Sequence, residues 1–345
     1  IYVRINDVTD WILANGTTEW SAKINASELE EGEYVISVKA IDEHGLYEEE
    51  SITITIDKTP PSFWISELPD KYIRETTLNI TWDGYDALSG IDHYEISIDQ
   101  EEWVNVGLNT SYILMNLSQG AHEFRVRAYD RAGNYCEKTI FFVVDYTPPE
   151  LSITPSGVVY TNNHTVLIRW QAQDNVSGID HYEVRLDDGE WVNVGNLTEW
   201  NFTISSEGDH EIYVRAFDRA GNNQTARVVF VTDYTPPSLE ILQPTNDSYL
   251  NDHLIIITWQ AQDDVSGIDH YEVRLDDGEW LNLGVSTYYG FANLTEGMYE
   301  VYVRAYDIAG NFREVKLIFT VDYTAPSITV LSPANNTEIK NTSIT

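Results

Sequence analysis

The sequence predicts an all-β protein of tandem seven-stranded β-sandwiches arranged as a rod. The first observation is internal repetition, because DNVSGIDHYEVRLD at 174–187 recurs almost unchanged at 263–276 and more loosely at 86–99. The second is hydrophobic alternation with period two around these copies, which is typical of strands. The third is a turn signal about every 8 to 12 residues, which favours a sandwich.

Asp-x-Thr-x-Pro signals divide the chain into repeats. They occur at Asp57, Asp145, Asp233 and Asp322, in steps of 88, 88 and 89 residues. We therefore expect three complete repeats, preceded by the later part of one repeat and followed by the opening part of another. The predicted domains are 1–57, 58–145, 146–233, 234–322 and 323–345.

The middle repeat shows why each element is expected. Residues 165–173 place Val166, Ile168 and Trp170 on one face and polar residues on the other, so they form a half-buried strand. Asp187-Asp188-Gly189 predicts a hairpin turn, and 219–222 a further turn. No segment has a convincing helical period. The expected strands are 150–154, 165–173, 180–186, 191–194, 199–204, 211–218 and 225–232.

The two incomplete segments fit the same pattern. Residues 3–5 take the place of 184–186, and Trp11 takes the place of the hairpin tryptophan. Residues 341–345 reach the start of the strand that carries the core tryptophan. Neither segment supplies both sheets of a sandwich. We expect a polypeptide that continues on both sides; the alternative is that the tail of one chain completes the head of the next.

Charge and composition limit the partners. The formal net charge is −36, which repels phosphate backbones and anionic lipids, so we expect no nucleic-acid partner and no direct membrane contact. Hydrophobic residues make up 42% of the chain, which argues against disorder. Cys136 is the single cysteine, so no intrachain disulfide can form.

Asparagine is concentrated in Asn-x-Ser/Thr sequons. Fourteen of the 24 asparagines lie in one, whereas 52 Ser and Thr among 345 residues predict about four by chance. We therefore expect covalent N-glycans and an extracellular or cell-surface location. The sequon asparagines are Asn15, Asn25, Asn79, Asn109, Asn116, Asn163, Asn175, Asn196, Asn201, Asn223, Asn246, Asn293, Asn335 and Asn341. The loop sites among them are expected at Asn109, Asn163, Asn196 and Asn246.

Several motifs of the repeat resemble known domains. Trp170, Gly-Ile-Asp-His-Tyr-Glu-Val at 178–184, the 213–218 stretch and Gly221 resemble a fibronectin type III domain. With the Asp-Tyr-Thr-Pro-Pro junctions, the repeats more closely resemble prokaryotic Ig-like repeats of giant surface proteins. The resemblance covers all 345 residues. It implies stalks, adhesins, surface layers, filaments or spacers of secreted enzymes, and it fixes the fold better than the function.

Repetition argues against catalysis. His93, His181 and His270 are equivalent residues, and a catalytic constellation needs to be assembled only once. The chain has no P-loop, HExxH, GxSxG or CxxC motif. We expect no enzymatic activity in this stretch.

The sharper chemical prediction is a calcium site at each junction. The predicted strand order brings the turns after Trp170 and Phe217 to the end of the sandwich where the preceding junction lies. Three carboxylates then meet, and Asn134, Asn222 or Asn311 could add a carbonyl oxygen, as a hard cation such as Ca²⁺ requires. The expected sets are Asp57, Asp86 and Asp130; Asp145, Asp174 and Asp218; and Asp233, Asp263 and Asp307.

A simpler interpretation competes with the cation. Asp and Asn also cap turns by accepting hydrogen bonds from their own backbone, and Arg131 or Arg219 is placed to neutralise the carboxylates. The last complete repeat has Ile308 at this arginine position, so its junction is the strongest candidate for a cation.

Histidine and tryptophan have structural explanations as well. The equivalent histidines point outward beside Arg185 and Phe217, as a lateral packing face or as a surface ladder of charged and aromatic pairs. The alternation of side chains along their strands places Trp82, Trp170 and Trp259 on the face that points into the core. The hairpin tryptophans Trp103, Trp191 and Trp280 are expected to pack over the sheet edge rather than to bind sugar.

The favoured function is structural. We expect a glycosylated component of an extracellular rod, surface layer or filament, whose partners are other copies of itself packed laterally or head to tail. Many sequons without disulfides favour an archaeal exterior. The alternatives are an adhesin stalk whose ligand-binding tip lies elsewhere and a spacer region of a secreted hydrolase.

Overall fold

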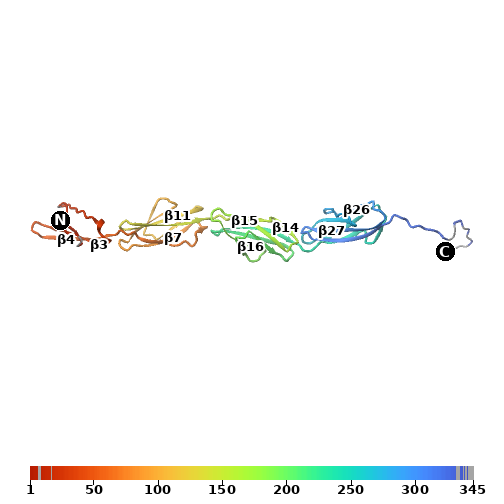
Figure 1. Ribbon diagram of the computed structural model, residues 1–345, viewed down its shortest axis with the longest axis horizontal. Helices are drawn as coiled ribbons and strands as arrows, with labels where there is room; N and C mark the ends of the chain where they lie inside the picture. Colours follow the sequence, from red (N-terminus) through yellow and green to blue (C-terminus); the bar gives the residue numbers. More distant parts are fainter. Residues whose placement is uncertain (7–8, 17, 332–334, 337, 339, 341–345) are drawn as a thin grey trace. The chain divides into compact units, whose positions relative to one another are not determined.

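The computed structural model describes residues 1–6, 9–16, 18–331, 335–336, 338 and 340. Its regular structure is β, apart from one short 3-10 helix, η1 (Ala26–Glu28), among the described residues (Figure 1). Within those ranges, no helix has the length and apolar character needed to cross a bilayer. Two compact units make up the chain. They are Ile1–Leu151 with Ala172–Tyr182 and Arg215–Gln224, and Ser152–Gln171 with Glu183–Val214 and Thr225–Thr345.

Residues 58–145 form two facing sheets. The three-stranded sheet has the order β10-β7-β5, and the five-stranded sheet has the order β6-β12-β11-β8-β9. The strands are β5 (Ser62–Ile65), β6 (Tyr72–Ile73), β7 (Leu78–Tyr85), β8 (Ile91–Ile98), β9 (Val104–Gly107), β10 (Ser111–Leu114), β11 (Gly120–Asp130) and β12 (Tyr135–Val144). All pairs are antiparallel except β6 with β12, which is parallel.

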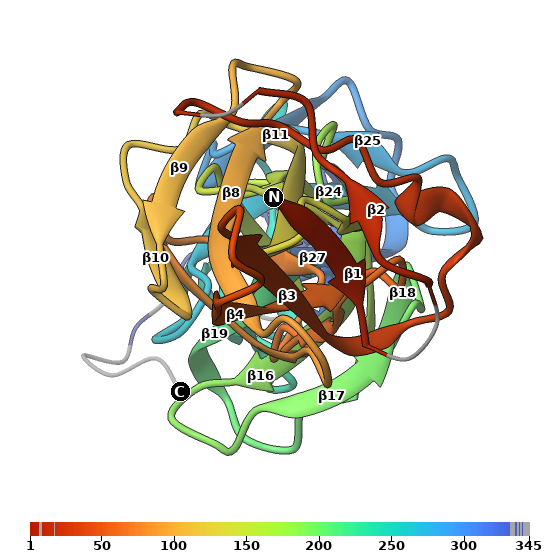
Figure 2. The same ribbon diagram turned by 90° about the vertical axis from the view of Figure 1, so that its left-hand side faces the viewer.

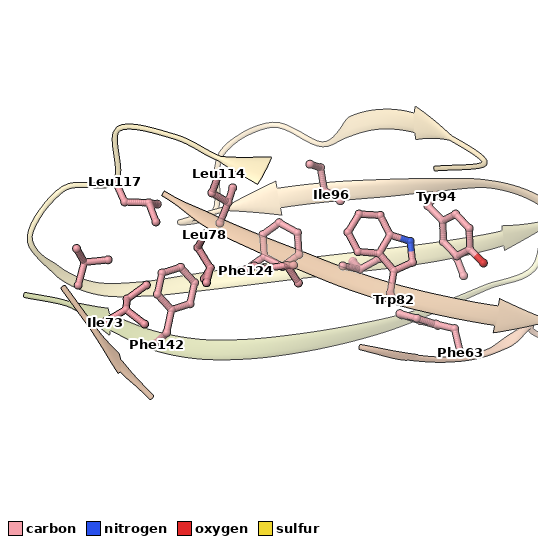
Figure 3. Packing of buried hydrophobic residues seen from close by; sticks show 14 residues of the cluster. Phe63, Ile73, Leu78, Trp82, Tyr94, Ile96, Leu114, Leu117, Phe124 and Phe142 are labelled. Atoms are coloured by element: carbon pink, nitrogen blue, oxygen red, sulfur yellow. The ribbon is translucent and has the colours of Figure 1, made fainter. Parts of the chain in front are cut away.

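The core lies between the inner faces of these sheets. Every second residue of β11 is buried, because successive side chains of a strand point to opposite faces. Trp82 of β7 lies at the centre, with its ring edge-on to Tyr94 at 6.0 Å and tilted against Phe124 at 6.2 Å (Figure 3). Trp170 and Trp259 are 5% and 2% exposed, so all three tryptophans predicted as core are buried.

The other two complete repeats have the same sheet orders. In 146–233 the strands are β13 (Glu150–Thr154), β14 (Val158–Thr161), β15 (Thr165–Gln173), β16 (Ile179–Leu186), β17 (Val192–Gly195), β18 (Glu199–Thr203), β19 (Gly208–Asp218) and β20 (Asn223–Thr232). In 234–322 they are β21 (Ser238–Gln243), β22 (Ser248–Leu250), β23 (Leu254–Gln262), β24 (Ile268–Leu275), β25 (Leu281–Asn282), β26 (Tyr288–Ala292), β27 (Gly297–Asp307) and β28 (Phe312–Val321). The predicted all-β fold of tandem β-sandwiches is confirmed.

The predicted strand count was one too low. β14 is an eighth strand of the middle repeat, and it pairs in parallel with β20 from Val158 to Thr161. It lies at the edge of the five-stranded sheet, between Gly157 and Asn162. β6 and β22 are its equivalents in the other repeats, so this edge strand belongs to the fold.

Residues 1–57 form a single described sheet. Its order is β2-β1-β3-β4, and Figure 2 shows β1 between β2 and β3. The strands are β1 (Tyr2–Ile5), β2 (Ile12–Leu13), β3 (Gly32–Ile41) and β4 (Tyr47–Ile56). The guanidinium carbon of Arg4 lies 4.8 Å from the ring of Trp11, which confirms the predicted place of this tryptophan. The described part of 323–345 has no strand, and the predicted strand start at 341–345 lies outside the described residues.

Candidate functional site

Three aspartates meet at the same end of each complete repeat. In each set, one carboxylate oxygen per residue lies within 4.8 Å of the others. The sets are Asp57, Asp86 and Asp130; Asp145, Asp174 and Asp218; and Asp233, Asp263 and Asp307. All nine predicted residues therefore fall into the three expected clusters, here called the aspartate triads.

Strand ends position the carboxylates. In the middle triad, Asp145 follows β12, Asp174 follows β15 and Asp218 ends β19. The Oδ1 atom of Asp174 accepts hydrogen bonds from the backbone N–H groups of 176, 177 and 178 at 3.0, 2.8 and 2.7 Å. Gly178 has a φ of +78°, which lets the chain wrap around this oxygen and which a side chain would disfavour. The Asp-x-x-Ser-Gly stretch is thus an Asx-type turn.

Asparagine ties the junction to the turn after β19. The Nδ2 atom of Asn222 donates to the main-chain oxygen of Asp145 and to Oδ2 of Asp218, both at 2.8 Å. Asn134 and Asn311 make the equivalent bonds. The prediction that these asparagines present carbonyl oxygens to a cation was wrong, because their amide nitrogens face the carboxylates.

Sequence reasoning also missed the serine of this turn. The backbone N–H of Ser177 donates to Oδ2 of Asp145 at 3.1 Å, and Ser89 and Ser266 do the same in their repeats. The available signal was the recurrence of serine at one place of every Asp-x-x-Ser-Gly copy. Without the register of the turn, that recurrence did not show which aspartate the serine binds.

The pKa values of the triad members are shifted in opposite directions. Burial raises the pKa of Asp218, and the charges of Asp145 and Asp174 raise it further, while bonds from Asn222 act the other way. Burial likewise raises the pKa of Asp307, with a contribution from Asp233. By contrast, hydrogen bonds from Ser177 and Thr147 outweigh burial and lower the pKa of Asp145. A carboxylate destabilised by its neighbours' charge is one that a bound cation would relieve.

Hydrogen bonding accounts for most oxygens of the triads. In the middle triad, donors among the described residues reach five of the six carboxylate oxygens, and Oδ2 of Asp174 is the exception. Arg131 and Arg219 form no ion pair with these carboxylates in the part of the chain that the structure describes. Turn capping therefore explains the observed bonds, and the calcium site stays a prediction.

The outer face of each five-stranded sheet carries stacked rings and guanidinium groups. His181 stacks on Phe217 with ring centroids 4.6 Å apart, and His93 and His270 stack on Tyr129 and Tyr306. Above Trp103, the guanidinium carbon of Arg127 is 3.8 Å from the ring centroid; Arg304 covers Trp280 at the same distance. This packing fits the surface ladder and leaves the covered tryptophan faces unsuited to sugar binding.

The sequon asparagines share one structural property. All thirteen within the described residues are exposed, and the fourteenth, Asn341, lies outside those residues. Asn109, Asn163, Asn196 and Asn246 lie between strands, as predicted. Enzymatic attachment of a glycan requires access to the side-chain amide, so this exposure is compatible with modification.

Sequence comparison gives distant relatives. No protein-family model matches the chain. A Kelch domain-containing protein of Sulfurisphaera tokodaii is 23% identical over 80% of this chain, Exoglucanase B of Cellulomonas fimi 24% over 79%, and Bacillopeptidase F of Bacillus subtilis 24% over 60%. The chain spans 37%, 26% and 14% of their respective lengths.

The similar solved structures include sets of modules and of tandem repeats. Fibronectin(III)-like modules of CbhA from Clostridium thermocellum have a TM-score of 0.34 and 18% identity, over 50% of this chain and 94% of theirs. A tetra-tandem repeat from the extending region of a large adhesion protein has a TM-score of 0.38 and 17% identity, over 94% and 92%.

Proposed function

We propose that this chain is a non-catalytic, N-glycosylated stretch of Ig-like sandwiches in an extracellular rod, surface layer or filament, where it associates with other copies of itself. The observation that supports this most is the use of the polar groups. The triads, histidines and arginines recur in equivalent places, and most of their bonds stay within one repeat. Such groups hold a repeat together and leave little for substrate chemistry.

Exposure of every described sequon asparagine supports the extracellular part of the proposal. Cys136 is the single cysteine, so no intrachain disulfide can form, and this fits an archaeal exterior better than an animal one. The charge of −36 supports partners other than nucleic acid or a membrane surface.

The second candidate is a spacer region of a secreted hydrolase. It is favoured by two relatives whose names denote hydrolases, Exoglucanase B and Bacillopeptidase F. Negative-stain imaging of the native material, with mass spectrometry of the intact polypeptide, separates the two. Rods, lattices or filaments of a repeat-only polypeptide are expected. A catalytic domain on the same polypeptide, without assemblies, would contradict the structural function.

We further propose that Ca²⁺ binds the triads, most strongly the one containing Asp263, whose repeat lacks the neighbouring arginine. A cation would offset the mutual repulsion of three carboxylates, and binding to the folded state alone raises stability. Adding Ca²⁺ should raise the melting temperature and excess chelator should lower it, and Asp263→Asn should remove part of the gain. Identical melting curves with calcium and with chelator would leave turn capping as the whole role.

A further inference from the structure

The outer face of the three-stranded sheet in 234–322 carries an exposed apolar patch. Leu254, Ile256 and Tyr288 are 53%, 50% and 61% exposed, although such side chains are usually buried. Gly290 lies directly across from Ile256 in the β23–β26 register. A Cβ atom at Gly290 would lie 3.0 Å from Cδ1 of Leu254, so this leucine covers the glycine and the patch is continuous. We call these four residues the apolar patch.

The same place in each of the other two repeats pairs one asparagine with one apolar residue. Asn79 pairs with Ile113 in the β7–β10 register, and Leu167 pairs with Asn201 in the β15–β18 register. These two pairs are equivalent to Ile256 with Gly290. Each therefore contains one exposed sequon asparagine, whereas the pair in 234–322 contains none. An N-glycan on Asn79 or Asn201 would stand at the centre of this face.

The surroundings of the apolar patch are almost uncharged. Glu240 is the one charged residue among the outward side chains of β21, β23 and β26. Elsewhere a net charge of −36 makes copies of the chain repel one another. Like-charged copies approach most easily where both present a neutral, apolar surface, because burial of that surface is not opposed by charge.

We propose that the apolar patch is a docking surface for a second copy of this chain, which packs through its own apolar patch. Two identical faces meeting about a two-fold axis form an isologous interface, with Tyr288 of each copy against the aliphatic side chains of the other. Packing of two sheets face to face is a common solution for such surfaces. This proposal specifies the partner named under the proposed function and rests on it.

The test uses the full chain made in a host that does not attach N-glycans, so that association through the apolar patch is measured without attached glycans. Sedimentation velocity should show a dimer whose fraction increases with concentration. Leu254→Thr with Tyr288→Ser installs the residues found at the equivalent positions 77 and 111. This double variant should weaken the dimer at least tenfold, and an unchanged melting temperature would show that it still folds. Ile113→Thr, on the same face of 58–145, is the matched control and should leave the dimer unaffected.

A second variant tests the surface in a glycosylating host. Ile256→Asn gives the tripeptide Asn-Ile-Thr, as at 79–81, and the added mass reports whether the site is modified. The modified variant should be monomeric where the wild-type chain is dimeric. A wild-type chain that stays monomeric at high concentration, or a dimer that both variants leave intact, would overturn the proposal. Neither result affects the imaging test of the structural function, so the two can fail separately.

Discussion

Position 122 and its equivalents show how one structural bond is made by two kinds of residue. Nε2 of His122 lies 2.8 Å from the main-chain oxygen of Ser118, and Nδ1 lies 2.7 Å from Oδ2 of Asp99. In 234–322 the hydroxyl of Tyr299 donates to the main-chain oxygen of Thr295 at 3.0 Å. In both repeats the bonded oxygen is four residues earlier, so the fold requires a donor here that either ring can supply.

Substitution of His122 should follow this requirement. His122→Tyr keeps a donor for the Ser118 oxygen and should change the local free energy of unfolding by less than about 1 kcal/mol. Both variants lose the bond to Asp99, but His122→Phe also removes the partner of the Ser118 oxygen and should cost about 1 to 3 kcal/mol. Hydrogen exchange of the β11 amides in the full chain measures both. Equal losses of unfolding free energy for the two variants would show that ring size, rather than the hydrogen bond, determines which residues are tolerated at position 122.

Two members of the middle triad, Asp145 and Asp218, make opposite contributions to the pH dependence of the stability of the fold. The pKa of Asp145 is lowered from 3.8, so its stabilising effect is present above that value and is lost as pH falls through the folded-state pKa. The pKa of Asp218 is raised, so its effect runs the other way: the folded state is favoured at low pH, and this is lost as pH rises through the folded-state pKa. Carboxyl ¹³C NMR should find Asp218 titrating above Asp145. Saturating Ca²⁺ should lower the titration midpoint of Asp218, and buffer free of Ca²⁺ and Mg²⁺ provides the control. Equal midpoints for Asp218 and Asp145 would contradict the opposite pKa shifts.

At the level of strands, a large residue on one strand is matched by a small one on its neighbour. Phe63 of β5 lies across from Gly84 of β7, and a Cβ atom on Gly84 would lie 2.9 Å from Cβ of Phe63 and 2.8 Å from the Tyr94 hydroxyl. In 234–322 the corresponding pair is Leu239 with Ala261. The two pairs fill similar volume in different ways, as close packing requires.

This pairing predicts coupled substitutions. Gly84→Ala alone should destabilise the repeat by about 1 to 3 kcal/mol, because the core there has no space for a methyl group. Phe63→Leu alone should also destabilise, by leaving a cavity. The double variant reproduces the Leu239–Ala261 pair and should recover much of the loss. A double-mutant cycle from hydrogen exchange measures the coupling, and additive effects would contradict direct contact.

The strands that sequence reasoning predicted best are those with one buried face. β15 and β23 alternate between buried and exposed residues over nine positions, so their period is visible in the sequence. β14 was missed because four residues at a sheet edge, paired in parallel, give too short a pattern to distinguish strand from loop. The triads were predictable because turns at one sandwich end follow from strand order. The direction of the Asn222 amide depends on local donors and acceptors, which spacing does not determine.

For the molecule as a whole, the chain between repeats is short and bonded on both sides. The Nε2 atom of Gln119 donates a hydrogen bond to the hydroxyl of Thr147 at 2.6 Å, and the side-chain amide of Asn222 donates to the main-chain oxygen of Asp145. Pro148 and Pro149 follow at once, and each ring fixes φ near −65°. We therefore expect a stiff junction between 58–145 and 146–233.

Replacing both prolines should loosen this junction. Pro148→Gly with Pro149→Gly restores backbone freedom to two adjacent residues, so the distances between neighbouring repeats should spread over a wider range. Small-angle X-ray scattering of the full chain measures that spread through the pair-distance distribution. Leu108→Gly with Asn109→Gly, in the exposed loop between β9 and β10, is the control, because it adds the same glycines inside one repeat. The junction variant should broaden the distribution while the control should not. A wild-type scattering profile like that of a freely jointed chain would contradict a stiff junction. An unchanged profile in the junction variant would show that the Gln119 and Asn222 bonds, rather than the prolines, keep the junction stiff.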